Sequence, residues 1–145
     1  MNEIHTRGKV KLLLVDDQQL IRMALKARLS KYADFTIVGE ANSGKSAIIF
    51  ARMLNPDVIL MDIEMPELDG IEATRRIRAR MPQMRVLILT SHAQPSNISA
   101  AFDAGADGYC LKIADNNDLA NAIRTVSRGG CWLDSAIARQ LPGAS

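Results

Sequence analysis

The sequence predicts an α/β fold built on a doubly wound, five-stranded parallel sheet, and two observations support this. Short apolar runs of strand length alternate with longer segments whose apolar residues recur at helical spacing. The most apolar runs, such as Val58-Ile59-Leu60-Met61, have no polar alternation, which is typical of strands buried on both faces of a parallel sheet. Right-handed crossovers between such strands place helices on both faces of the sheet.

Each predicted strand is an apolar stretch that ends at a polar residue. The strands cover residues 9–15, 35–39, 57–61, 85–89 and 109–111. The helices between them begin or end at recognisable signals: Ser43 as a cap, Asn55-Pro56 and Pro82 as stops, Asn116 or Asn117 as a cap, and Gly129-Gly130 as a stop. The five helices cover about 18–32, 43–54, 69–81, 96–104 and 116–128. We expect a further helical start over 131–141 and no regular structure over 142–145.

Composition excludes several classes of protein. A chain of 145 residues with 48% hydrophobic content fits one globular domain, and a net charge of +2 is too small to indicate nucleic-acid binding. The only cysteines, Cys110 and Cys131, lack metal-ligand spacing, which indicates reduced thiols in a cytoplasmic protein. The first residues lack the apolar core of a signal peptide, and no apolar run has membrane-spanning length.

Polar residues collect where the apolar strands end. Asp16 and Asp17 end the first strand, Asp62 the third, Thr90 the fourth and Lys112 the fifth. A parallel sheet brings these ends to one edge, where ligand sites of such folds lie. Carboxylates gathered there repel one another, and all-oxygen ligands favour Mg²⁺ or Mn²⁺ over zinc. Lys112 and Thr90 suit the oxygens of a phosphoryl group.

These residues predict phosphoryl chemistry, with Asp62 as the nucleophile that forms an aspartyl phosphate. A single Asp after a strand is usually a turn or cap residue. The coincidence at four strand ends is what indicates a site.

Several stretches together resemble the receiver domain of two-component response regulators. They are Leu13-Leu14-Val15-Asp16-Asp17, residues 56–66 (PDVILMDIEMP) with Asp69-Gly70, residues 86–91 (VLILTS), and residues 104–109 (AGADGY) with Lys112. The resemblance covers about residues 9–130. It implies a flavodoxin/CheY-like sheet of strand order 2-1-3-4-5.

The resemblance also implies roles for the site residues. Asp62 would accept a phosphoryl group from a phosphohistidine of a sensor histidine kinase. Asp16, Asp17 and Asp62 would hold Mg²⁺ together with the backbone carbonyl of Glu64, while Lys112 would contact the phosphate.

Two further residues would form the family's switch. Thr90 would supply the hydroxyl that responds to phosphorylation, and Tyr109 the aromatic ring that moves inward with it. The surface around the fourth helix, fifth strand and fifth helix would then change and alter dimerisation or partner binding. Such a protein modifies itself and is not a turnover enzyme.

The C-terminal residues 118–126 (DLANAIRTV) and 129–133 (GGCWL) are similar to the NarL/FixJ (LuxR-type) subfamily. This similarity implies that residues 131–145 begin a linker toward a helix-turn-helix domain that lies outside the chain. DNA binding and control of transcription would depend on that domain. The alternative is a stand-alone receiver that acts through protein–protein contacts.

One departure from the family pattern follows Lys112. Receivers often have a proline there with a cis bond, whereas this chain has Ile113. We expect a cis Lys112–Ile113 bond all the same, at a cost of about 3–4 kcal/mol.

Residues 39–46 (GEANSGKS) offer a different function. From Gly39 to Ser46 they match the phosphate-binding pattern G-x-x-x-x-G-K-[ST] between a strand and a helix. A nucleotide-binding protein is therefore an alternative. It leaves Asp16-Asp17, Thr90 and Lys112 unexplained, and the segment has few glycines to wrap phosphates.

Overall fold

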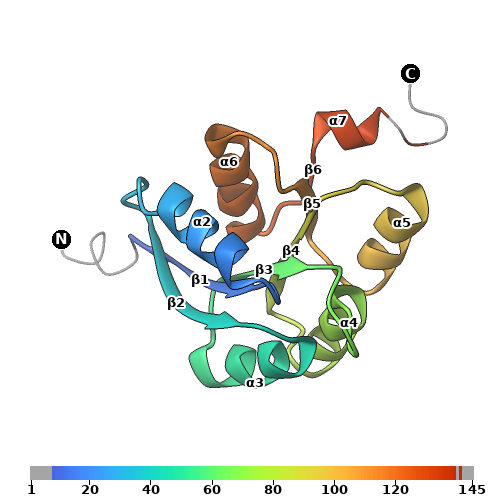
Figure 1. Cartoon of the computed structure of the whole chain (residues 1–145), viewed down its shortest axis with the longest axis horizontal. Helices are drawn as coiled ribbons and strands as arrows, with labels where there is room; N and C mark the ends of the chain where they lie inside the picture. Colours follow the sequence, from blue (N-terminus) through green and yellow to red (C-terminus); the bar gives the residue numbers. More distant parts are fainter. Residues whose placement is uncertain (1–7, 140, 142–145) are drawn as a thin grey trace.

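The computed structural model describes residues 8–139 and 141, and its centre is a sheet of six parallel strands (Figure 1). The strands are β1 (Val10–Val15), β2 (Phe35–Ala41), β3 (Val58–Asp62), β4 (Arg85–Thr90), β5 (Gly108–Leu111) and β6 (Trp132–Leu133). Their order is β2-β1-β3-β4-β5-β6, so the order expected for the first five strands is confirmed. Because all pairs are parallel, the carboxyl ends of the strands share one edge.

Helices cover both faces of the sheet, as a doubly wound fold requires (Figure 1). The helices are α2 (Gln19–Leu29), α3 (Gly44–Leu54), α4 (Gly70–Arg80), α5 (Pro95–Asp103), α6 (Asn116–Ser127) and α7 (Ser135–Ala138). α2 and α6 lie on one face, and α3, α4 and α5 lie on the other.

The central strands are apolar throughout because each of their faces contributes to a separate core. In β1, Leu12 and Leu14 pack toward α2 and α6, while Leu13 packs toward α3. In β3 the alternation repeats, with Leu60 on the first side and Ile59 on the second. The result is a strand such as β3 with no exposed residue, and its terminal Asp62 is carried to a buried position.

The expectation of a five-stranded sheet is wrong, because the described residues hold six strands. Their six helices are the five expected between the strands and the further helix expected within 131–141. The segment after α6 was expected to be helical from residue 131. It first adds β6 to the outer edge of β5, in the register Gly108↔Trp132 and Tyr109↔Leu133, and only then forms the single turn of α7. A strand of two residues has too few positions to show alternation. The expectation for 142–145 lies outside the described residues.

Two local expectations are also corrected. No cis peptide bond occurs among the described residues, so Lys112–Ile113 is trans, which a non-proline bond strongly prefers. The cap of α6 is Asp115, whose side chain accepts a hydrogen bond from the Asp118 backbone N–H at 2.8 Å, instead of Asn116 or Asn117.

The phosphate-binding pattern folds as an ordinary strand–helix connection. β2 continues to Ala41, only two residues follow, and α3 begins at Gly44. Ser43 and Ser46 form a capping box that uses the amides at the start of the helix. A Cβ on Gly44 would meet the Leu68 carbonyl at 2.5 Å, so this glycine serves close packing. No open loop is left to wrap a phosphate.

Within the residues described, no helix combines the length and the apolar character needed to cross a bilayer.

Candidate functional site

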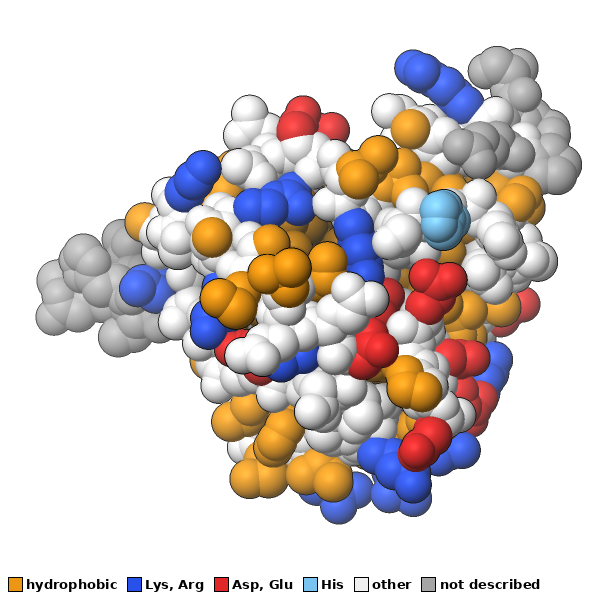
Figure 2. Space-filling model, in the orientation of Figure 1, with side chains coloured by type: hydrophobic (Ala, Val, Ile, Leu, Met, Phe, Trp, Pro, Cys, Tyr) orange, Lys and Arg blue, Asp and Glu red, His pale blue; other side chains and the backbone are white. Residues whose placement is uncertain are grey.

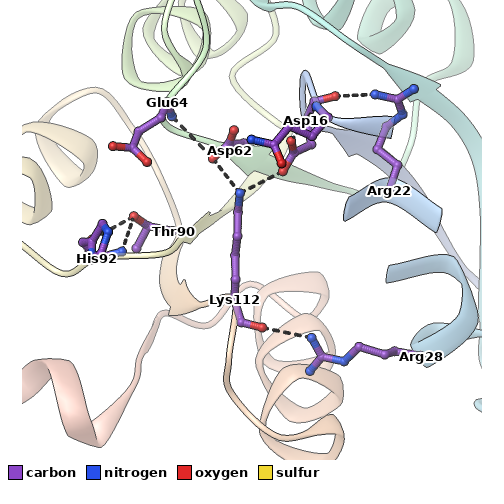
Figure 3. Close-up of polar contacts among 9 residues, drawn as sticks. Asp16, Arg22, Arg28, Asp62, Glu64, Thr90, His92 and Lys112 are labelled. Carbon is purple, nitrogen blue, oxygen red and sulfur yellow. Dashed lines mark hydrogen bonds and ion pairs between the residues drawn. The ribbon is translucent and has the colours of Figure 1, made fainter. Parts of the chain in front are cut away.

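Four strand ends meet in one acidic site, as the sequence predicts (Figure 3). Asp16 follows β1, Asp62 and Thr90 are the last residues of β3 and β4, and Lys112 follows β5. The side chain of Lys112 reaches back across the edge of the sheet. Its Nζ lies 2.9 Å from Oδ2 of Asp16 and 3.1 Å from Oδ1 of Asp62.

Burial distinguishes the carboxylates of the site. Asp16 is 1% and Asp62 4% exposed, whereas Asp17 is exposed. Asp16 is also fixed by its neighbours, since its Oδ1 accepts a hydrogen bond from the Gln18 backbone N–H at 2.9 Å. The site thus combines two buried carboxylates, Asp16 and Asp62, with a third, Asp17, that reaches solvent.

The electrostatics of the site make Asp62 unusual. Burial, with the charge of Asp16 as a second cause, raises the pKa of Asp62 to about 6, although Lys112 acts in the opposite direction. Burial by itself would lower the pKa of Lys112, but its pairing with Asp16 and Asp62 raises it. At neutral pH the site therefore holds a cationic lysine between two acids.

The donor set fits a hard divalent cation. Asp16, Asp17 and Asp62 each offer a carboxylate oxygen, and these oxygens lie within 4.8 Å of one another. One ammonium cannot neutralise three carboxylates, and oxygen-only ligands suit Mg²⁺ or Mn²⁺. The Glu64 backbone N–H donates to Oδ1 of Asp62 at 3.4 Å, so Glu64 lies beside the acid. Its carbonyl as a further ligand stays a prediction.

The Thr90 hydroxyl is engaged away from the acidic cluster. It donates a hydrogen bond to the His92 carbonyl at 2.7 Å and accepts one from the His92 backbone N–H at 3.2 Å (Figure 3). Thr90 is thereby tied to the loop that leads into α5. Breaking these contacts would free its hydroxyl for another acceptor.

The Tyr109 ring is already fully buried in this structure. It belongs to the same apolar cluster as Ile137 of α7 and Leu133 of β6, so the C-terminal segment helps to cover it. No hydrogen bond of standard geometry reaches its hydroxyl within the part of the chain that the structure describes. Burial raises the pKa of Tyr109, and the Thr90 side chain beside it acts in the opposite direction. Its role in a switch stays a prediction.

Sequence reasoning missed several residues that support the site. Arg22 and Arg28 of α2 bind backbone carbonyls of Asp16 and Lys112. Asp134, which is 8% exposed, accepts hydrogen bonds from the Leu111 backbone N–H and the Trp132 indole N–H, both at 2.7 Å. Such contacts leave no local pattern. The sequence offers one sign of such a role: Arg28 falls among the apolar positions of its helix face, where a charged side chain needs a partner.

Comparison with known proteins gives a consistent result. The sequence profile of the response regulator receiver domain matches residues 12–124. The response regulator protein VraR of Staphylococcus aureus is 45% identical over 120 residues, which cover 83% of this chain and 57% of VraR. The chain therefore spans just over half the length of this curated relative.

Solved structures agree with the sequence relatives. A LuxR-family two-component response regulator from Aurantimonas superposes with a TM-score of 0.88 at 32% identity, covering 92% of this chain and 95% of that one. The receiver domain of the putative response regulator NarL from Mycobacterium tuberculosis gives a TM-score of 0.80 at 30% identity, covering 84% and 98%. This chain belongs to the response regulator receiver domain family, in its NarL/FixJ (LuxR-type) branch.

Proposed function

We propose that this chain is a phosphorylation-dependent receiver that accepts a phosphoryl group on Asp62 from a sensor histidine kinase and changes its association state in response. The observation that carries the proposal is the convergence of Asp16, Asp62 and Lys112 within hydrogen-bonding distance at the edge of the sheet. A structural ion pair alone would not require a third acid, Asp17, that reaches solvent beside them.

In the proposed reaction, a carboxylate oxygen of Asp62 attacks the phosphorus of the phosphohistidine. The new O–P bond forms as the N–P bond breaks, and the imidazole leaves and takes up a proton. With its pKa raised to about 6, Asp62 is mostly ionised at neutral pH, so attack needs no general base. A divalent cation held by the acidic cluster would neutralise charge on the phosphoryl oxygens.

Lys112 has two roles in this proposal. Before transfer it pairs with Asp16 and Asp62 and keeps the buried acids compatible with folding. After transfer, its ammonium is positioned to pair with a phosphoryl oxygen on Asp62. Thr90 would give up its contacts with His92 for the same group, and the loop into α5 would move with it.

The output of the whole protein is a further part of the proposal. The relative VraR is longer than the matched region, and the LuxR-type branch leads us to propose a helix-turn-helix domain beyond Ser145. Phosphorylation would then favour a homodimer and control DNA binding through that domain. A stand-alone receiver that acts on a protein partner uses the same site and is the alternative.

The direct test is incubation of the chain with Mg²⁺ and acetyl phosphate, followed by intact-mass measurement. We expect the mass to increase by one phosphoryl group in the wild type and not in Asp62→Asn. Asp103→Asn, on the exposed surface of α5, is the matched control and should be phosphorylated normally. A mass increase that survives Asp62→Asn would refute Asp62 as the acceptor.

A further inference from the structure

Helix α2 contacts both halves of the ion pair that joins the first strand end to the fifth. Near its N-terminus, Arg22 Nη1 donates to the Asp16 carbonyl at 2.5 Å. In its last turn, Arg28 Nη1 donates to the Lys112 carbonyl at 3.0 Å. The side chains of Asp16 and Lys112 meet 2.9 Å apart (Figure 3). One helix therefore holds the main chains of two residues whose side chains form the site.

Of these two arginines, Arg28 makes the hydrogen bonds to the loop that carries Lys112. Its Nε donates to Oδ1 of Asn116 at 2.7 Å and its Nη2 to the Ala114 carbonyl at 2.5 Å, in addition to the bond to Lys112. All three nitrogens of the guanidinium thus bind the connection between β5 and α6. A planar fork with fixed donor directions can hold three acceptors at once, whereas a lysine ammonium cannot reproduce that arrangement.

The connection has few other restraints. Lys112 is followed by a trans bond to Ile113, a residue that is 84% exposed and therefore adds little packing to the loop. Its backbone bonds are Lys112 N–H to the Thr90 carbonyl at 2.8 Å and Ala114 N–H to the Leu111 carbonyl at 3.1 Å. These fix the start of the loop. The Lys112 and Ala114 carbonyls beyond it are held from α2.

We propose that Arg28 is a positioning residue for phosphoryl transfer: by binding the Lys112 and Ala114 carbonyls and Asn116, it fixes the loop so that the Lys112 ammonium stays over Asp16 and Asp62. The inference rests on the proposed function of the site and extends it to a residue that contacts neither the acidic cluster nor the phosphoryl group. A small displacement of a group that must meet the transition state is costly, with about 1 Å reducing rates by as much as about 100-fold.

Two substitutions of Arg28 distinguish the positioning of the loop from the charge of the side chain. Arg28→Met removes the fork and the charge, while Arg28→Lys keeps the charge and loses the fork. We expect both variants to be phosphorylated by acetyl phosphate about 10- to 100-fold more slowly than wild type. Arg124→Met is the matched control, because it cuts an arginine tether between α6 and Asp34 at the opposite edge of the sheet. We expect it to retain the wild-type rate.

A double-mutant cycle shows whether Arg28 acts through Lys112. If it does, adding Arg28→Met to Lys112→Ala should change the remaining rate by less than about twofold. Additive losses, or a wild-type rate for Arg28→Lys, would overturn the proposal, the latter because only charge would then matter.

A readout on the resting protein keeps this inference separate from the proposed function. NMR of lysine side-chain ¹⁵N should show a slowly exchanging Lys112 ammonium in the wild type, because two buried acids hold it. The signal should weaken in Arg28→Met and Arg28→Lys and persist in Arg124→Met. An unchanged signal in the Arg28 variants refutes positioning. Failure of the wild type to accept a phosphoryl group refutes the proposed function instead, while the ammonium signal still reports on Arg28.

Discussion

Asp16 and Asp62 share one ammonium group: Lys112 Nζ lies 2.9 Å from an oxygen of the first carboxylate and 3.1 Å from an oxygen of the second. When both carboxylates are ionised, one ammonium balances only one of their two charges. Both acids are buried, so solvent does little to offset the excess. That imbalance makes the site responsive to protons, to cations and to a phosphoryl group.

The stability of the metal-free protein should depend on Asp62 and on pH. The pKa of Asp62 is raised from 3.8 to about 6, so folding favours the protonated acid. The stability that this group contributes is complete below about pH 4 and is lost as the pH rises through about 6. Asp62→Asn should therefore be more stable than wild type at pH 7.5, and the difference should shrink toward pH 4. Urea unfolding in the presence of EDTA, repeated across this pH range, measures the difference in stability between the variant and the wild type. A difference that does not change with pH would contradict the raised pKa of Asp62.

Removing the shared ammonium should destabilise the fold in a way that a cation repairs. Lys112→Met leaves Asp16 and Asp62 buried without a counter-charge, which typically costs about 3–5 kcal/mol. Added Mg²⁺ should restore much of this loss, and its effect on the variant should exceed its effect on the wild type. Urea denaturation with and without Mg²⁺ is the measurement. Lys45→Met, on the first turn of α3, is the control and should show no such dependence.

Thr90→Ala should separate phosphorylation from its consequence. The variant loses two contacts with the His92 backbone, at a cost of about 1 kcal/mol, but keeps the acidic cluster. We expect acetyl phosphate to modify Asp62 as in the wild type, without the shift in association state that follows. Intact mass and light scattering on the same sample test both parts. Thr90→Ser retains the hydroxyl and should behave as the wild type does.

Asp134→Ala should loosen the C-terminal segment from β5. The buried carboxylate accepts from the Leu111 backbone N–H and the Trp132 indole, and leaving these donors unpaired should cost about 1–3 kcal/mol. Trp132 is the only tryptophan in the chain, so its fluorescence reports the change directly. A red-shifted emission and a lower urea midpoint are expected. Asp115→Ala, which removes the α6 cap instead, should lower the midpoint without shifting the emission.

The acidic cluster could be predicted because each of its residues follows an apolar strand. Asp16, Asp62, Thr90 and Lys112 are read from the sequence as the polar residues at which the apolar runs stop, and parallel pairing then brings them together. No distance along the chain enters that argument. This is why residues so far apart could be assigned to one site.

The supporting contacts could not be predicted, because their partners are backbone groups in other elements. Arg28 binds two carbonyls of the β5–α6 loop and Asp134 binds an amide of β5, and neither pairing leaves a periodic pattern. The predicted cap of α6 was wrong for a related reason. Asp115 and Asn116 are both good capping residues, and their order in sequence does not show which one precedes the first turn.

The outer margin of the sheet is closed by the two residues of β6. Trp132 N–H bonds to the Asp107 carbonyl at 3.1 Å, and the Leu111 N–H is taken by Asp134. A polypeptide that stopped at Gly130 would leave β5 with a row of unpaired donors and acceptors beside the uncovered Tyr109 ring. Such a margin invites strands of neighbouring molecules to add to it, so a shortened chain would tend toward edge-to-edge aggregation that has nothing to do with signalling.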